Sequence, residues 1–324
     1  MTVAVGFFDG VHLGHRAILA GADVALTFEN HPLAFLAPER APRLIMSWSE
    51  KAQAIRDLGV HVTAIDFDAD VAGWSPERFL ERLRGYATGW SERLAIPAEP
   101  LRIRCGANWR FGKGGAGDAA FARAHGIETT VVPYAEHKGE PISSTRIRKA
   151  LEAGELEDAA AMLGRPFVVR GTAFAGKGLG RGLGYPTLNL RLDLGLRLPL
   201  GVYAVAAGGV RGVANFGRAP TMGERAWSEP VLEVHFLEPP PAEPPPCVTL
   251  RRYLRPERRF ASLAELQAQI ARDCEEARRF GTAERDEKGD LTIEKREISS
   301  DPTALNLKFV SETENTPLSN EAKF

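Results

Sequence analysis

Residues 3–16, VAVGFFDGVHLGHR, join an apolar β-type run to a glycine-rich turn and the start of a helix. Glycine lets the backbone approach a ligand, and the N–H groups and dipole at a helix N-terminus favour an anion. His12 and His15 stand three residues apart, so both imidazoles can project from one face of the first helical turn. The stretch therefore predicts a nucleotide-phosphate site, although a glycine-rich turn with two surface histidines is the simpler alternative.

Short β-type runs alternate with helical patterns up to about residue 165, which predicts a parallel sheet with crossover helices. The candidate strands are Val3–Phe8, Val24–Phe28, His61–Phe67, Leu101–Cys105 and Thr129–Tyr134. Ser47 followed by Glu50 has the spacing of a capping box, and Ser75 before Pro76 marks a second helix start. Gly59 is a candidate stop for the first of these helices.

Between residues 166 and 255 the pattern changes to short β-runs separated by glycine and proline, which predicts a compact barrel or sandwich. The runs are Phe167–Phe174, Gly201–Ala206, Val213–Phe216, Leu232–Leu237 and Val248–Tyr253. Ser262 with Glu265 caps a final predicted helix, and after Phe280 the chain turns acidic and poor in large apolar residues. We expect domains at 1–164 and 165–280, and a mostly disordered tail at 281–324.

The composition fits a globular protein of about two domains, with 324 residues, 44% of them hydrophobic. The 41 basic and 42 acidic residues nearly cancel, so no global field favours a nucleic acid or an anionic membrane as partner. Three widely spaced cysteines lack the pattern of a zinc site or a redox dithiol. With no signal-peptide pattern and no apolar stretch approaching about 18 residues, we expect a cytoplasmic protein.

Two other glycine-rich segments could bind phosphate. The first, Gly112–Gly117, fits the dinucleotide fingerprint GxGxxG, but the six residues 106–111 separate it from the end of the preceding predicted strand. In the second, GKGLGRGLG at 176–184, the glycines give a mobile backbone that can fold over phosphates, with Lys177 and Arg181 to neutralise charge. No helix follows it and the chain has no Walker sequence, so its alternatives are a phosphate loop of another kind or a flexible linker.

Four ordered blocks of the first half resemble HxGH nucleotidylyl transferases, specifically the adenylyltransferase half of bacterial bifunctional riboflavin kinase/FAD synthetases. They are GFFDGVHLGH at 6–15, TFENHP at 27–32, GANWRFG at 106–112 and ISSTRIR at 142–148. The resemblance implies a Rossmann-like domain in which His12 and His15 stabilise charge on the α-phosphate of ATP, while the FMN phosphate attacks and pyrophosphate leaves. The nucleotide site it implies comprises Gly6, Phe8, Asp9, Gly10, Gly14, Asn108, Ser143, Ser144, Thr145 and Arg148. Phe28, His31 and Pro32 are the implied flavin contacts.

The second half resembles the riboflavin kinase module of the same enzymes, in GVYAV at 201–205, GVANFGRAPT at 212–221, LEVHF at 232–236 and YLRPERRFASLAELQAQIARD at 253–273. That module is a small six-stranded β-barrel with a trailing helix. By resemblance Thr187 and Asn189 hold Mg²⁺ and ATP phosphates, and Glu233 deprotonates the terminal ribityl hydroxyl of riboflavin. The implied phosphate-binding residues are Gly176, Lys177, Gly178, Gly180 and Arg181. From strand alternation alone, Glu233 would be an outward-facing strand residue.

Some residues depart from the family pattern or leave simpler interpretations open. Asn30 stands where the family often has proline, and Leu188 where alanine is common. The serines and threonine of block 142–148 also suit plain helix capping. The arginines between 251 and 259 could mimic a nucleic-acid patch, but the family match through this run favours a barrel edge leading into the final helix.

The sequence thus predicts a bifunctional enzyme that uses ATP and Mg²⁺ to phosphorylate riboflavin to FMN and to adenylylate FMN to FAD. Its partners would be these small molecules, with no nucleic acid or membrane. One alternative is an FAD synthetase whose second domain lacks kinase activity. Another is a non-catalytic regulator that binds a flavin or nucleotide, and a dinucleotide-dependent oxidoreductase is a remote fourth.

Overall fold

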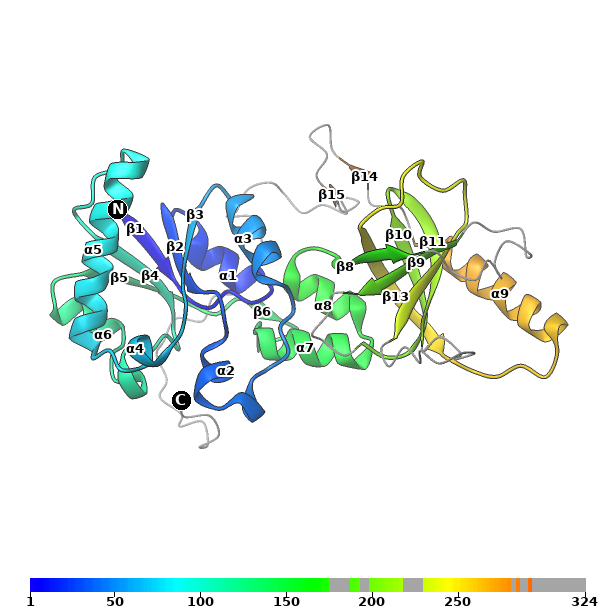
Figure 1. Ribbon diagram of the computed structural model, residues 1–324, viewed down its shortest axis with the longest axis horizontal. Helices are drawn as coiled ribbons and strands as arrows, with labels where there is room; N and C mark the ends of the chain where they lie inside the picture. The colour runs from blue at the N-terminus through cyan, green and yellow to red at the C-terminus, as the bar shows by residue number, and fades with distance from the viewer. Residues whose placement is uncertain (175–186, 193–197, 218–229, 281–283, 286–290, 293–324) are drawn as a thin grey trace. The chain divides into compact units, whose positions relative to one another are not determined.

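The computed structural model describes residues 1–174, 187–192, 198–217, 230–280, 284–285 and 291–292 (Figure 1). It divides into two compact units, one containing Met1–Ser144 and one beginning at Thr145. Among the described residues, no helix is long and apolar enough to cross a membrane.

The first unit is built on five parallel strands in the order β3-β2-β1-β4-β5, as the alternating pattern predicts. The strands are β1 Thr2–Val5, β2 Val24–Phe28, β3 His61–Ile65, β4 Arg102–Gly106 and β5 Glu128–Val132. β1 ends three residues before the predicted limit, because the chain turns sharply after Gly6. The carboxyl ends of all five strands therefore meet along one edge, where ligands of such sheets bind.

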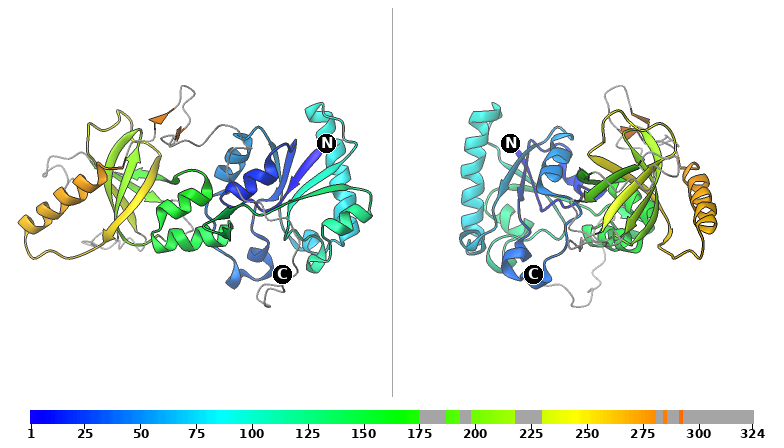
Figure 2. Two further views of the ribbon diagram at one scale, coloured as in Figure 1. Left: turned by 180° about the vertical axis from the view of Figure 1, so that it is seen from behind. Right: turned by 45° about the vertical axis from the view of Figure 1, so that its right-hand side comes forward.

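Helices cover both faces of this sheet (Figure 2). They are α1 Leu13–Leu19, α2 Pro32–Leu36, α3 Trp48–Arg56, α4 Ala69–Ala72, α5 Pro76–Leu94 and α6 Ala119–Ala124, with 3₁₀ turns η1 Pro38–Arg40 and η2 Lys113–Gly115 and a short hairpin of β6 Glu136–His137 and β7 Glu140–Pro141. Ser47 forms the predicted capping box with Glu50, and Ser75 caps α5. α3 ends at Arg56, so Gly59 lies in the following turn at φ 77° and is not the residue that ends the helix.

The apolar residues of β1 alternate between two cores. Val3 and Val5 pack with the long helix α5 and with β4, whereas Ala4 packs with α1 and α3 through Leu19 and Ile55. A parallel strand buried on both faces must be apolar throughout, and this one is. β1 is consequently the central support of the turn that follows it.

The second unit is a closed antiparallel barrel in the order β10-β11-β12-β9-β8-β13, which decides between barrel and sandwich. Two helices precede the barrel: α7 Ser144–Ala153, which belongs to this unit from Thr145 onward, and α8 Leu156–Leu163. The barrel strands and the helix after them are β8 Phe167–Phe174, β9 Thr187–Leu192, β10 Gly201–Ala207, β11 Val210–Gly217, β12 Val231–Phe236, β13 Cys247–Pro256 and α9 Leu263–Ala277. The two-residue strands β14 Glu284–Arg285 and β15 Leu291–Thr292 pair with each other. β9 is absent from the predicted strands. Apart from those two short strands, the predicted tail lies outside the described residues.

The barrel has an inner face and an outer face that α9 partly covers. Val202 and Val213 pack against Cys274 of α9, so this set of residues points outward. Leu190 and Val234, on the opposite set, are fully buried. Because cross-strand partners share a face, the register around Val213 tells which residues of β9, β11 and β12 lie outside.

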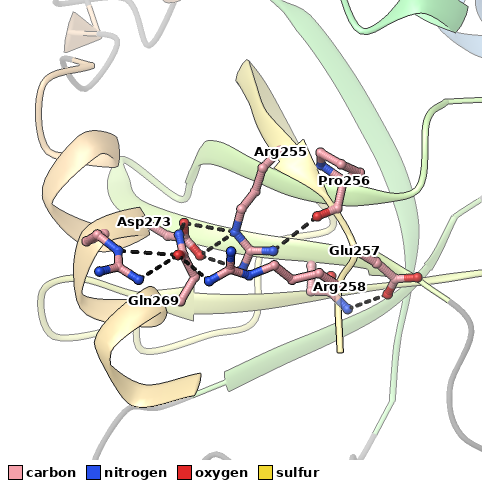
Figure 3. A network of polar contacts seen from close by, with 8 residues as sticks. Arg255, Pro256, Glu257, Arg258, Gln269 and Asp273 are labelled. Atoms are coloured by element: carbon pink, nitrogen blue, oxygen red, sulfur yellow. Dashed lines mark hydrogen bonds and ion pairs between the residues drawn. The ribbon is translucent and has the colours of Figure 1, made fainter. Parts of the chain in front are cut away.

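A polar network attaches α9 to the end of β13 (Figure 3). Arg255 forks onto the buried carboxylate of Asp273, with Nε 3.0 Å from Oδ1 and Nη2 2.7 Å from Oδ2. Gln269 donates to Asp273 Oδ1 at 2.7 Å and accepts from Arg258 at 2.7 Å. Two arginines of the basic run, Arg255 and Arg258, therefore serve the attachment of α9, in keeping with a barrel edge.

Candidate active sites

The turn after β1 has a backbone that ordinary residues rarely adopt. Phe8 and Val11 have φ of 58° and 41°, and the N–H of Val11 donates to the carbonyl of Phe8 at 3.0 Å. Bulky and β-branched side chains strongly disfavour positive φ, and such strain gathers at functional sites. A Cβ at Gly6 would lie 2.9 Å from the Phe8 ring, so the turn also requires glycine there.

Two hydrogen-bonding side chains hold this turn in place. The carboxylate of Asp9, 2% exposed, accepts from the N–H of Ile45 at 3.0 and 3.2 Å. Ser144 Oγ donates to the carbonyl of Asp9 at 2.9 Å. Asp9 and Ser144, both predicted nucleotide-site residues, thus meet in the structure, and their contacts to the backbone fix the strained turn.

The two histidines lie together at the N-terminus of α1. His12 is the N-cap residue, and its Nδ1 accepts from the N–H of His15 at 3.2 Å. Their rings stack with centroids 3.6 Å apart at 17°, and the Phe8 ring meets His15 edge-on at 5.4 Å. Since Nδ1 of His12 accepts, its neutral ring carries the proton on Nε2. Gly14 lies between the two histidines in the first turn of α1.

The charge state of His15 is determined by its surroundings. Burial, then His12, then Lys51 lower the pKa of His15 well below the ordinary histidine value, so the ring is neutral at pH 7. His15 Nδ1 and Arg16 Nε are buried and have no hydrogen-bond partner within the described part of the chain. Unsatisfied buried polar atoms at a helix N-terminus are typical of a site that binds a polar ligand.

The predicted flavin contacts lie at the end of β2. His31 caps α2 through Nδ1, which accepts from the N–H of Leu33 at 3.1 Å, and Pro32 is the first residue of that helix. Phe28 and Phe67 meet edge-on at 5.2 Å. A third ring, Phe35 at 46% exposed, stands 6.2 Å from Phe67. Only Phe28 was predicted from the sequence, because Phe35 lies just beyond the block TFENHP and Phe67 comes from the separate segment after β3.

Asn30 provides a local reason for its departure from the family pattern. Its side chain donates to the carbonyl of Phe67 at 3.0 Å and accepts from the Phe67 N–H at 2.8 Å. A proline could form neither bond. In this chain the amide therefore ties the end of β2 to the segment after β3.

The remaining residues predicted to bind the nucleotide are divided between the two units. Asn108 follows the end of β4, the neighbour of β1, and so stands on the same edge of the sheet. Ser143 immediately precedes α7. Thr145 and Arg148 lie on α7 in the second unit, and their role stays a prediction.

The GxGxxG segment has a structural explanation. Its first glycine is six residues beyond the end of β4, so it does not form a strand-to-helix turn. A Cβ at Gly112 would lie 2.8 Å from Pro76 N, and one at Gly117 would lie 2.6 Å from the Phe111 ring. These glycines allow close packing, and a dinucleotide fingerprint is not needed to explain them.

A second cluster of polar residues lies on the outer face of the barrel. Across adjacent strands, Asn189 pairs with Glu233, and Glu233 pairs with Asn215. Thr187 pairs with His235, which is the partner of outward-facing Val213. The strand register thus brings Thr187, Asn189 and Glu233 together, and it confirms the outward placement that alternation gives Glu233.

Asn215 and Glu257 extend this cluster, and neither was predicted from the sequence. Asn215 Nδ2 donates to Glu257 Oε1 at 3.2 Å, which links β11 to the segment after β13. His235, on the same outer face, has its pKa lowered by burial, while the charge of Glu233 acts to raise it. The predicted phosphate loop with Gly176, Lys177, Gly178, Gly180 and Arg181 lies outside the described residues.

The donor set of this cluster fits a hard cation that shares its coordination with phosphate. Thr187 and Asn189 carry oxygen donors on one face of β9, and Mg²⁺ commonly binds one or two protein oxygens plus phosphates and water. In the part of the chain that the structure describes, no group of three or more His, Cys, Asp or Glu residues could hold a metal by itself.

Comparison with known proteins assigns the two units. The FAD synthetase family model matches residues 1–146, and the riboflavin kinase model matches residues 163–281. The bifunctional riboflavin kinase/FMN adenylyltransferase of Escherichia coli K12 is 35% identical over 301 residues, which cover 86% of this chain and 92% of that protein. The chain belongs to the bifunctional riboflavin kinase/FMN adenylyltransferase family. The bifunctional riboflavin kinase/FMN adenylyltransferase of Bacillus subtilis strain 168 is 31% identical over 303 residues, which cover 86% of this chain and 92% of that protein.

A solved structure of similar fold covers both domains of this bifunctional chain. It is titled a macrolide-efflux protein from Streptococcus pneumoniae, and it matches with a TM-score of 0.73 and 27% identity over 86% of this chain and 94% of that chain. This likeness concerns the fold. The histidine pair lies in the FAD synthetase domain and the outer-face cluster in the riboflavin kinase domain.

Proposed function

We propose that the chain makes FAD from riboflavin in two ATP-dependent steps at two separate sites. The outer-face cluster around Glu233 phosphorylates riboflavin to FMN. The histidine pair then transfers the adenylyl group of ATP to FMN and releases pyrophosphate. The observation that carries this proposal is the stacked His12–His15 pair at a helix N-terminus after a strained turn.

Adenylyl transfer at the first site depends on stabilising negative charge. An oxygen of the FMN phosphate attacks the α-phosphorus of ATP, a new P–O bond forms, and the bond to pyrophosphate breaks. Nε2–H of His12, the neutral ring of His15 and the N–H groups of α1 can donate to the phosphate oxygens on which charge increases. Catalysis of this type requires positioning and electrostatics and no covalent intermediate.

Phosphoryl transfer at the second site begins with an alcohol, so it needs a base. Glu233 accepts the proton of the terminal ribityl hydroxyl while that oxygen attacks the γ-phosphorus of ATP and ADP leaves. Thr187 and Asn189 would hold Mg²⁺ together with the phosphates. When bound, the ion neutralises phosphate charge. Asn215, beside Glu233 in the register, is suited to orient the carboxylate or the flavin side chain.

Incubation of the purified chain with riboflavin, ATP and Mg²⁺, followed by chromatography, tests the proposal. We expect FMN to appear first and FAD to follow. FAD from supplied FMN, but no product from riboflavin, would leave only the adenylyltransferase. No flavin conversion at all would favour a binding protein. We further propose that these reactions take place in the cytoplasm, with small molecules as the partners.

A further inference from the structure

Lys51 is a buried lysine whose ammonium group is fully engaged beside the histidine pair. It lies on α3 and is 3% exposed. Its Nζ is 2.7 Å from the carbonyl oxygen of Phe28, 3.0 Å from that of Phe7 and 3.4 Å from Thr27 Oγ1. The three N–H groups of an ammonium thus face three acceptors. Nζ also lies 4.0 Å from the centre of the Phe7 ring, within range of a cation–π contact.

The acceptors of Lys51 belong to the two segments that hold the two substrates in the proposed reaction. Phe7 is part of the strained turn that leads to the histidines, and Phe28 ends β2 on the flavin side. Thr27 Oγ1 donates to the same Phe7 carbonyl at 3.0 Å, and the Phe7 ring meets His31 edge-on at 4.6 Å. One cation therefore connects the nucleotide turn to the flavin segment.

Burial of the charged Lys51 ammonium is unfavourable in free energy. Burial lowers the pKa of Lys51 to about 8, although the charges of Asp9 and Glu29 act to raise it. A lowered lysine pKa means that the folded protein holds the ammonium less favourably than water does. Groups with such pKa values cluster at functional sites.

We propose that Lys51 is a positioning residue for adenylyl transfer, whose ammonium fixes the distance between the nucleotide turn and the flavin end of β2. The inference rests on the proposed adenylyltransferase function. Its charge is also one of the causes that hold His15 neutral, next to burial and His12. Lys51 does not need to touch either substrate, because its hydrogen bonds are already made within the protein.

The pH dependence of this role has a definite sign. As pH rises through about 8, Lys51 loses its proton, one of its three N–H donors and its charge. The charged groups that act on Lys51 are Asp9 and Glu29, and those that act on His15 are His12 and Lys51. We therefore expect adenylyl transfer to decline above about pH 8. In Lys51→Arg that decline should move to higher pH, because a guanidinium stays charged.

The test compares Lys51→Met and Lys51→Arg with Lys113→Met, which removes an exposed lysine of the same unit. FAD formation from FMN and ATP is followed as kcat and KM from pH 6 to pH 10. Riboflavin phosphorylation by the same preparations serves as the internal control, since Glu233 lies in the other unit. For Lys51→Met we expect kcat of FAD formation to fall by about tenfold to a hundredfold, as a misplaced site predicts. Kinase activity and Lys113→Met should stay at the wild-type level.

Two results would overturn the role of Lys51. One is a wild-type kcat and pH profile in Lys51→Met. The other is a decline of FAD formation in Lys51→Arg at the same alkaline pH as in the wild type. This second result overturns the role even where Lys51→Met unfolds the first unit. His15→Ala in the same assay distinguishes a failure of the positioning role from a failure of the proposed function. If His15→Ala abolishes FAD formation while Lys51→Met forms FAD at the wild-type rate, only the positioning role fails. If the wild-type protein forms no FAD, the proposed function fails.

Discussion

The two candidate sites are built in opposite ways. The first comes from one continuous run, in which a strand, a strained turn and a helix start place Asp9, His12 and His15 within a few residues of one another. The second is assembled across the barrel, where the register places Asn189, Glu233 and Asn215 side by side from three strands. A local site can be recognised in a sequence, whereas a site made by register exists only once the barrel has closed.

The sites differ equally in charge. The neutral His15, its stacked partner His12, the N–H groups of α1 and the Lys51 ammonium surround the first, which suits the transfer of an adenylyl group to a phosphate. Carboxylates and amides surround the second, where Glu233 and the Asn215–Glu257 pair lie on the outer face. That donor set suits an alcohol that must lose a proton.

The largest expected effect is at Glu233. Glu233→Gln keeps the shape of the side chain but removes the base, so riboflavin phosphorylation should fall by about 10²- to 10⁴-fold. FAD formation from supplied FMN should stay at the wild-type rate, as measured by chromatography of both flavins. Glu243→Gln, an exposed carboxylate in the same unit, is the matched control. A kinase rate within twofold of wild type in Glu233→Gln would rule out this residue as the base.

Removing a charge-stabilising donor should have a somewhat smaller effect. His15→Ala is expected to lower FAD formation from FMN by about 10²- to 10³-fold, the range for loss of one donor at a developing negative charge. Riboflavin phosphorylation should be unaffected in the same preparation. His125→Ala, which changes a histidine on the opposite side of the sheet at the end of α6, serves as the control. Equal loss of both activities in a folded His15→Ala protein would argue against separate sites.

Much of the local structure could be predicted from the sequence. The caps at Ser47, Ser75 and Ser262 depend on residues three apart, and all three are confirmed. Strand β9 was missed because Thr187–Leu192 follows a glycine-rich run, and its stability comes from pairing with β8 and β12, which are distant in sequence. Helix caps can therefore be predicted from neighbouring residues, whereas a strand such as β9 depends on pairing partners that are distant in sequence.

The candidate sites divide along the same line. The spacing of His12 and His15 predicts that both rings lie on one face of the helix. The structure adds that the two rings stack on each other, which spacing alone does not predict. Lys51 was missed because a lysine one turn into an amphipathic helix is ordinarily exposed, and only its contacts with the turn after β1 and with the end of β2 bury it. Asn215 was missed because its importance depends on the register with Glu233.

The smallest expected effect concerns the attachment of α9 to the barrel. Asp273→Ala leaves the partly buried Arg255 without its carboxylate, so we expect the free energy of unfolding to fall by about 3 kcal/mol in denaturant titration. Glu238→Ala breaks the more exposed pair with Arg211 and should cost less than about 1 kcal/mol. FAD formation from FMN should not change in either variant. Equal destabilisation by both would show that burial of the Arg255–Asp273 pair is not what matters.

A mixture of His15→Ala and Glu233→Gln tests the central claim of two independent sites most directly. Given riboflavin, ATP and Mg²⁺, we expect His15→Ala alone to stop at FMN and Glu233→Gln alone to leave riboflavin unchanged. The two together should form FAD, because FMN made by one chain can be adenylylated by the other. Absence of FAD from the mixture, with each variant retaining its remaining single activity, would contradict the account.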